Sequence, residues 1–193
     1  MRISDDRYTR ERASLELALR FLHHEARTQT IRAWTGLSDD RIRKLYRSYM
    51  GHARRPSPRH RGKSPHQIAY FTRSLRLQQE TVALASMLSL LGLLPATTPP
   101  RAGAAAATDA AGNVLPGLTR GNLLCQAFEA FRLSVSAAQI SFEHAVFLVN
   151  ALARGDQLRL GGCSDCGTLV VTERLPLRAA RCHHCAAAMQ SRC

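Results

Sequence analysis

The sequence predicts a mostly α-helical protein with a helix-turn-helix-like N-terminal part and a small four-cysteine region at its C-terminal end. Apolar residues recur at the spacing of one helix face through most of the chain. Hydrophobic residues make up 45% of the 193 residues, so the helices can bury a core of their own. The last segment differs from the rest, because it is short, partly β-branched and rich in cysteine.

Changes of composition along the chain predict four segments. Residues 1–95 are expected to form a helical, helix-turn-helix-like basic region, and residues 118–154 a pair of helices. Between them, residues 96–117 are rich in Ala, Thr, Pro and Gly, which is typical of a loop or linker with no role in the core. Residues 155–193 form the cysteine-rich region.

The N-terminal part has the pattern of two helices joined by a short turn. A first helix is expected over residues 12–33, and Thr35-Gly-Leu ends it. Ser38 is expected to cap a second helix that runs to about Met50, because serine favours the N-cap and two aspartates follow it. The residues of this second helix predicted to face the core are Ile42, Leu45, Tyr46 and Tyr49.

Three further helices are expected, over residues 67–94, 119–137 and 141–154. Cys125 falls on the apolar side of the second of these and is expected to be a core thiol. The last of the three carries apolar residues on more than one face. It is therefore expected to be buried on more than one side, by the domain's own core or by a partner subunit.

Positive charge is concentrated in the first third of the chain. The formal net charge is +13, from 27 Lys and Arg and 14 Asp and Glu. Residues 1–66 hold 16 of these cations and 7 of the anions, whereas residues 67–193 hold 11 and 7. Such a basic balance indicates a polyanionic partner, either nucleic acid or an anionic membrane surface.

The second helix is expected to turn its basic residues away from the core. Such side chains contact phosphates, and arginine also reads guanine edges in the major groove. The loop over residues 52–66 adds cations on a Pro-rich tether that can follow a phosphate backbone. The predicted DNA-contacting residues are Arg41, Arg43, Lys44, Arg47, Arg54, Arg55, Arg59, Arg61 and Lys63. The alternatives are a solvated basic face of an all-α domain and a disordered surface loop.

The C-terminal cysteines have the spacing of a metal site. Cys163 and Cys166 form one C-x-x-C pair, and after 15 intervening residues Cys182 and Cys185 form a second. Zinc takes four thiolates at the corners of a tetrahedron, and each pair can reach the ion from one tight turn. Gly167 is expected to turn the backbone so that amides point at the sulfurs. The sequence thus predicts a four-cysteine zinc ribbon with one structural Zn²⁺ per chain.

Other interpretations of these residues are open. His183 or His184 could replace one cysteine as a ligand. A thioredoxin-like redox pair would stand in a βαβ context, which the sequence lacks. A catalytic zinc keeps an open position for water, and four cysteines leave none. Since the sequence offers no other catalytic set, the protein is predicted not to be an enzyme.

The sequence also predicts a cytoplasmic protein that does not enter a membrane. The N-terminus lacks the apolar segment of a signal peptide. The longest apolar run, residues 82–94, is shorter than the ~20 residues that span a bilayer. Thiols stay reduced in the cytosol, where paired cysteines more often bind metal than form disulfides.

Together these features resemble the FlhC family, a subunit of the bacterial flagellar master transcriptional activator. The resemblance is carried by Thr35-Gly-Leu-Ser38, by Arg43-Lys-Leu-Tyr46 with Gly51 after it, by the Pro-containing loop that follows, and by the four cysteines. It covers roughly residues 12–190. The chain departs from the family in the insertion over residues 96–117, in its short tail after the last zinc ligand and in the Arg-rich loop.

The resemblance implies a cytoplasmic helical protein that pairs with FlhD, binds promoter DNA and recruits RNA polymerase. On this basis the chain is expected to be a DNA-binding transcriptional activator subunit that acts with FlhD to switch on flagellar genes. The alternative is a zinc-ribbon adaptor that binds only protein partners, with its basic charge serving solubility or acidic partners.

Overall fold

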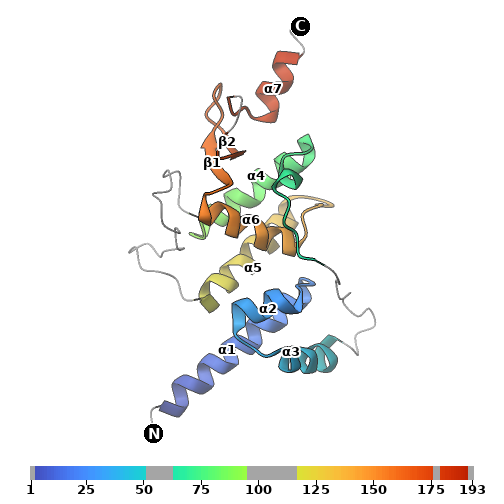
Figure 1. The fold of residues 1–193 in the computed structure, drawn as a ribbon, viewed down its shortest axis with the longest axis vertical. Helices are drawn as coiled ribbons and strands as arrows, with labels where there is room; N and C mark the ends of the chain where they lie inside the picture. The colour runs from blue at the N-terminus through green and yellow to red at the C-terminus, as the bar shows by residue number, and fades with distance from the viewer. Residues whose placement is uncertain (1–2, 51–62, 95–116, 176–178, 191–193) are drawn as a thin grey trace. The chain divides into compact units, whose positions relative to one another are not determined.

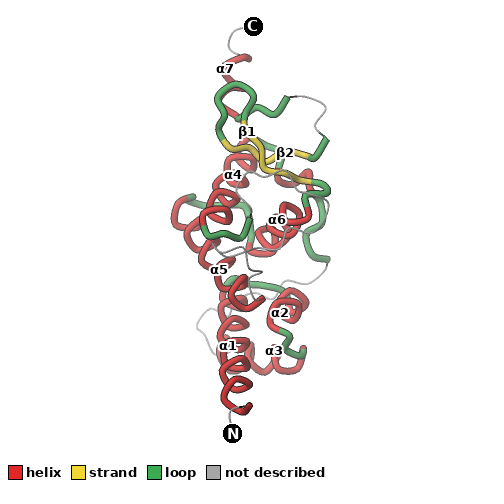
Figure 2. Tube along the Cα trace, turned by 90° about the vertical axis from the view of Figure 1, so that its left-hand side faces the viewer, coloured by secondary structure: helices red, strands yellow, loops and turns green. Residues whose placement is uncertain are grey.

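The computed structural model describes residues 3–50, 63–94, 117–175 and 179–190. Most of these residues are helical, as predicted, and the strands among them form one antiparallel pair (Figures 1 and 2). The chain divides into two compact units. Unit 1 is Met1–Ser64 with Pro116–Cys125, and unit 2 is Pro65–Leu115 with Gln126–Cys193.

Unit 1 is built from consecutive helices. Its elements are α1 (Ile3–His23), α2 (Thr28–Thr35), α3 (Asp39–Leu45), the π-helix η1 (Tyr46–Met50) that continues α3, and the first half of α5 (Gly117–Ser134). The single helix predicted over residues 12–33 is therefore two helices. The chain turns after α1, where Glu25 takes a φ of 61°. A non-glycine residue in this left-handed region is uncommon, so no sequence signal marked the break.

The turn between α2 and α3 forms as the sequence predicted. Gly36 takes a φ of 72° at the end of α2, and its amide donates to the carbonyl oxygen of Arg32 at 2.9 Å. Ser38 caps α3, because its Oγ accepts from the amide of Arg41 at 3.5 Å. Glycine and serine thus close one helix and start the next within three residues.

The predicted core face of the second helix is confirmed at Ile42 and wrong at Tyr49. Ile42 is buried, and Leu45 and Tyr46 are half-buried, but the Tyr49 side chain is 62% exposed. Met50 is buried in its place. The last turn is a π-helix, which holds more residues per turn than an α-helix, so the inward position falls one residue later.

The core of unit 1 depends on a close approach between α1 and α5. Leu17, Phe21 and Ile31 are fully buried there. A Cβ added at Gly121 of α5 would lie 2.6 Å from Cδ2 of Leu17. Cys125 on the same helix is buried, as predicted for a core thiol.

Unit 2 combines helices with a small sheet. It contains the 3-10 helix η2 (Ile68–Phe71), α4 (Leu75–Leu90), the second half of α5, and α6 (Phe142–Arg154). Ser74 and Ser141 are the N-caps of α4 and α6. α6 buries apolar side chains on more than one face, as predicted, including Phe142, Leu148 and Val149.

A buried carboxylate joins α4 to the loop that precedes α6. Glu80 is 2% exposed, and its Oε2 accepts from the amides of Gln139 at 2.8 Å and Ile140 at 3.2 Å. Its Oε1 accepts from Nε of Arg76 at 3.0 Å. Both oxygens of this side chain accept hydrogen bonds from α4 or from the neighbouring loop, which fixes one against the other.

The C-terminal part of unit 2 is a hairpin followed by a helix. β1 (Leu158–Gly162) pairs with β2 (Leu169–Glu173) in antiparallel register, with Leu160 opposite Val171. β2 coincides with the β-branched stretch of the cysteine-rich region, whereas β1 had no such signal in the sequence. α7 (His183–Gln190) completes the region. In the part of the chain that the structure describes, none of the helices has the length and apolarity needed to cross a bilayer.

Candidate metal centre

The first cysteine pair lies in the turn between β1 and β2. The amide of Cys163 donates to the carbonyl oxygen of Thr168 at 2.8 Å, and the amide of Gly167 donates back to that of Cys163 at 2.9 Å. Gly167 takes a φ of 74°, a conformation that glycine adopts at little cost. The predicted role of this glycine is confirmed, because the turn directs the amides of Asp165 and Cys166 to the Cys163 sulfur.

The second cysteine pair lies at the start of α7 and not in a hairpin turn. Cys182 immediately precedes the helix, and Cys185 is in its first turn. The amide of Cys185 lies 3.5 Å from the sulfur of Cys182, and the amide of Cys182 donates to the sulfur of Cys163 at 3.2 Å. The predicted zinc ribbon, with each cysteine pair in a tight turn, is therefore wrong for the second pair, because Cys182 and Cys185 lie at the start of a helix.

The four sulfur atoms of Cys163, Cys166, Cys182 and Cys185 all lie within 4.8 Å of one another. The sulfurs of Cys166 and Cys182 are 3.6 Å apart. Four thiolates at about 2.3 Å from a tetrahedral zinc ion would be separated from one another by about 3.8 Å. The cluster is thus close to the size that one zinc ion requires, and the cysteines can hold a metal. The sequence predicted all four of them.

Hydrogen bonds prepare two of the sulfurs to be thiolates. Backbone amides, first that of Cys182 and then those of Asp165 and Cys166, donate to Cys163 and lower its pKa to about 6. The hydroxyl of Thr168 lies 3.2 Å from the Cys166 sulfur and is the main cause of the lowered pKa of that thiol. Thr168 was not among the predicted site residues, although its position two residues after Cys166 is a signal that could have identified it.

Cys185 behaves in the opposite way. Its pKa is raised, first by the hydrogen bond with the Cys182 side chain and then by that with Cys166, because a thiol that donates to neighbouring sulfurs retains its proton. A cation at the centre of the cluster would replace this proton, since metal binding requires all four cysteines as thiolates. The unlike pKa values follow from thiols that share hydrogen bonds within one cluster.

The finger, as we call residues 158–190, has a small apolar core among the residues that the structure describes. Its buried cluster consists of Cys163, Val170 and Cys182, with Ala180 packed against it. The two halves are also joined by the ion pair of Arg181 Nε with Asp165 Oδ2 at 2.9 Å. Val170 and Leu158 are too few buried aliphatic residues to hold a segment of this length together, so a bound metal would supply the missing stabilisation.

The predicted basic residues lie partly within the described chain. The side chains of Arg41, Arg43, Lys44 and Arg47 are all exposed on α3 and η1. Arg41 pairs with Glu11 of α1, and Arg43 pairs with Asp40 at 2.8 Å. Lys63 is described and exposed. The remaining predicted residues, Arg54, Arg55, Arg59 and Arg61, lie outside the described residues.

The comparisons with known proteins do not identify the function of this site. No protein-family model matches the chain, and no curated protein matches it either. The assignment therefore comes from the site itself, which is a cluster of four sulfurs with hydrogen bonds that favour their ionised form.

Proposed function

We propose that the protein is a DNA-binding transcription regulator whose finger is folded by one structural zinc ion. The observation that carries the proposal is the row of exposed cations on α3 and η1, where four basic side chains lie on one short helical segment. Exposed arginine and lysine on one face of a helix suit the phosphate backbone and the major groove of duplex DNA.

The connection between α2 and α3 supports a helix-turn-helix interpretation of this region. Three residues, Gly36 to Ser38, separate the two helices, and the glycine is left-handed. Helix-turn-helix motifs join their helices through a turn of about three or four residues that often contains glycine. In such a motif α3 would be the helix that enters the groove, with its exposed side toward the bases.

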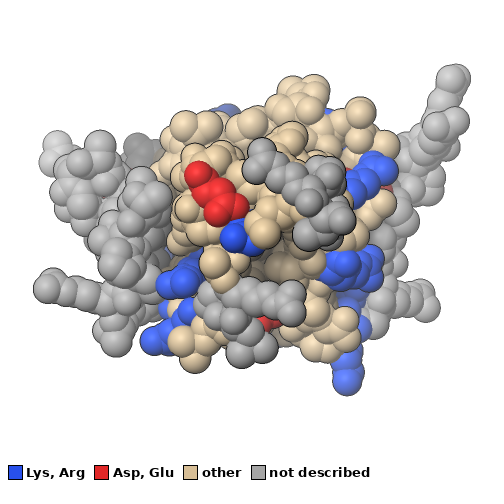
Figure 3. All heavy atoms as spheres, turned by 90° about the horizontal axis from the view of Figure 1, so that it is seen from above, with Lys and Arg blue, Asp and Glu red and all other residues tan. Residues whose placement is uncertain are grey.

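The finger is a less suitable surface for DNA. Four thiolates around one Zn²⁺ leave a formal charge of −2 at the cluster. In the view of Figure 3, the Lys and Arg side chains are spread among uncharged residues and do not gather into one patch. We therefore assign DNA binding to unit 1 and a structural role to the metal, with no catalytic activity, since four cysteines leave no position for a reacting water.

A kinship with the FlhC family is part of the proposal and is supported by the order of the motifs along the sequence. In this version the chain works in the cytoplasm with FlhD, binds flagellar promoter DNA and recruits RNA polymerase. Zn²⁺ is the metal that best suits four cysteine thiolates in a closed site. We propose one ion per chain.

The test is DNA binding by the zinc-loaded chain, with and without FlhD, to labelled flagellar promoter duplex at several salt concentrations. Replacing Arg43, Lys44 and Arg47 together by alanine should weaken binding and reduce the slope of log affinity against log salt by about 2.7. The matched control replaces three exposed arginines of unit 2, Arg132, Arg154 and Arg159, which removes the same charge from elsewhere.

Equal salt slopes for the α3 variant and the control variant would remove α3 from the interface. The metal is tested separately by elemental analysis. We expect about one zinc per chain for the parent and for Cys125→Ser, and metal-free or insoluble protein for Cys182→Ser. A folded Cys182→Ser protein with a full complement of zinc would refute the four-cysteine site.

One observation favours a second candidate function, an adaptor that binds only proteins. Two of the four cations on α3 and η1 already have carboxylate partners, Arg41 with Glu11 and Arg43 with Asp40. These pairs lower the net charge that the face offers to phosphates. Failure to bind promoter duplex at low salt, both alone and with FlhD, would favour the adaptor.

A further inference from the structure

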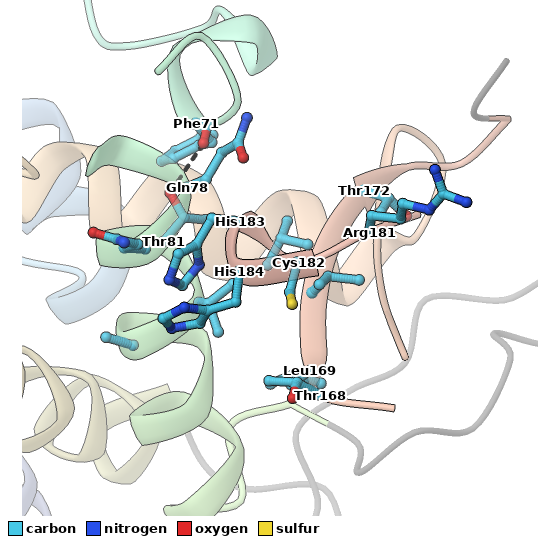
Figure 4. Close-up of a pocket in the computed structure, with 15 residues that line it drawn as sticks. Phe71, Gln78, Thr81, Thr168, Leu169, Thr172, Arg181, Cys182, His183 and His184 are labelled. Carbon is cyan, nitrogen blue, oxygen red and sulfur yellow. Dashed lines mark hydrogen bonds between the residues drawn. The ribbon is translucent and has the colours of Figure 1, made fainter. Parts of the chain in front are cut away.

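A cavity of about 240 Å³ lies in unit 2 beside the metal site (Figure 4). Its walls come from η2 and α4 on one side, from β2 on another, and from the residues that start α7. Cys182 is part of the lining, so one wall of the cavity is also a wall of the metal site. The cavity therefore lies where the finger meets α4.

The lining combines an apolar surface with polar side chains, none of which is a carboxylate. Phe71, Val82, Leu169 and Val171 are among its apolar members. The polar members are amides, hydroxyls, imidazoles and one guanidinium: Gln78, Gln79, Thr81, Thr168, Thr172, Arg181, His183 and His184. Every lining residue is described, and none is an aspartate or glutamate. The lining can thus offer several N–H and O–H donors and contains no carboxylate.

Several of these donors have no partner among the described residues. The rings of His183 and His184 contact each other, with centroids 3.9 Å apart, and make no hydrogen bond in that part of the chain. In Figure 4 both rings extend from the start of α7 toward α4. The hydroxyl of Thr172 is buried without a hydrogen-bond partner. An imidazole carries an N–H donor in either neutral tautomer, so donation does not require protonation.

Size restricts the ligand to a small molecule. A protein cavity of ~150 Å³ holds benzene, so by proportion this one suits roughly ten non-hydrogen atoms. Donors that lack a partner, next to an apolar wall, complement a hydrogen-bond acceptor on an apolar body. A carboxylate satisfies this requirement because it only accepts hydrogen bonds and can accept several at once.

We propose that this cavity binds a small organic carboxylate with an apolar, ring-sized body. The apolar body contacts Phe71, Val82 and Leu169, and the carboxylate accepts hydrogen bonds from the histidines at the start of α7. Because the bound molecule touches both α4 and the finger, it stabilises the folded finger and slows the loss of metal from the four cysteines. The site is independent of DNA binding and would make the finger responsive to a metabolite.

The test uses the full-length zinc-loaded chain with phenylacetate as the probe. Its neutral isostere phenylacetamide and the small anion acetate are the controls. By calorimetry or NMR titration we expect phenylacetate to bind with a Kd of about 1 mM and phenylacetamide about tenfold more weakly, because charge-assisted hydrogen bonds are the stronger kind. At ten times its Kd, phenylacetate should slow zinc transfer to a chelator by about tenfold, and acetate should not.

Two variants locate the binding. Ala83→Leu extends a side chain into the cavity and should abolish binding, whereas Ala33→Leu makes the same change at an exposed position of α2 and should not. His184→Ala removes a donor from an exposed side chain and should weaken phenylacetate but not phenylacetamide. The proposal is overturned if phenylacetate and phenylacetamide bind equally well, or if phenylacetate does not bind at 20-fold the expected Kd. It is also overturned if Ala83→Leu and His184→Ala both bind phenylacetate as tightly as the parent.

Discussion

Replacing Glu80 by alanine gives the sharpest test of how unit 2 holds its helices together. The carboxylate is buried and accepts from the amides of Gln139 and Ile140. Hydrogen bonds to a charged group are worth about 1.5–3 kcal/mol each. Without the carboxylate, the buried Ile140 amide has no acceptor, while the more exposed Gln139 can turn to water. Allowing a few tenths of a kcal/mol for the better helix propensity of alanine, we expect a loss of about 3–4 kcal/mol.

The assay is urea unfolding of the zinc-loaded protein, followed by far-ultraviolet circular dichroism. Glu80→Gln keeps an acceptor for the two amides but loses the charge and turns an amino group toward Arg76, so it should lose only about 1–2 kcal/mol. Glu16→Ala removes an exposed carboxylate that pairs with Arg12 and should leave stability near that of the parent. A Glu80→Ala protein within about 1 kcal/mol of the parent, or equal to Glu80→Gln, would contradict the reasoning.

Four further predictions concern the metal site and the basic helix. Gly167→Ala should weaken zinc binding by roughly tenfold, because alanine is strained at the positive φ of this position. Gly161→Ala is the control, since a Cβ there meets equally open space and the φ is not positive. Equal zinc affinities of the two variants in chelator competition would contradict this prediction. Ser38→Ala should destabilise unit 1 by about 0.5–1 kcal/mol in urea unfolding through loss of the α3 cap, and an unchanged midpoint would show the cap to be unimportant. Glu11→Gln frees the guanidinium that it pairs with on α3, so the salt slope of DNA binding should steepen by about one; a shallower slope would argue against phosphate contact. In metal-free protein the Cys163 thiolate should persist until the pH falls through about 6. Its pKa is lower in the folded chain than the ordinary 9.0, so the stability it contributes is complete above pH 9 and is lost as the pH falls through about 6. The measurement is the rate of Cys163 alkylation against pH, and a rate that changes only near pH 9 would contradict this prediction.

What could be predicted from the sequence was set by short-range signals. The cap at Ser38 and the glycine at position 36 act within a few residues, and both formed as expected. The four cysteines were equally readable, because C-x-x-C spacing brings two thiols together whatever surrounds them. The buried stripe of α5 around Cys125 also followed from helical periodicity alone.

What could not be predicted depends on contacts distant in sequence. Leu158–Gly162 contains two glycines and has little strand propensity, and it is extended because it pairs with β2. Tyr49 was expected inside because an α-helical repeat was assumed to continue to Met50, and the π-turn displaced it. Nor did the sequence show that residues of α4 would meet the finger around a cavity, since Val82 and Leu169 are far apart along the chain.

The small core of the finger has a consequence for how the protein can evolve. Val170 is the aliphatic member of its buried cluster, and the other two members are cysteines. Shape therefore depends on few positions, and the exposed side chains of the region that contact neither the cysteines nor the cavity are free to change in size and charge. Such a surface could acquire new interaction specificities by single substitutions, because few of them would disturb the framework that displays it.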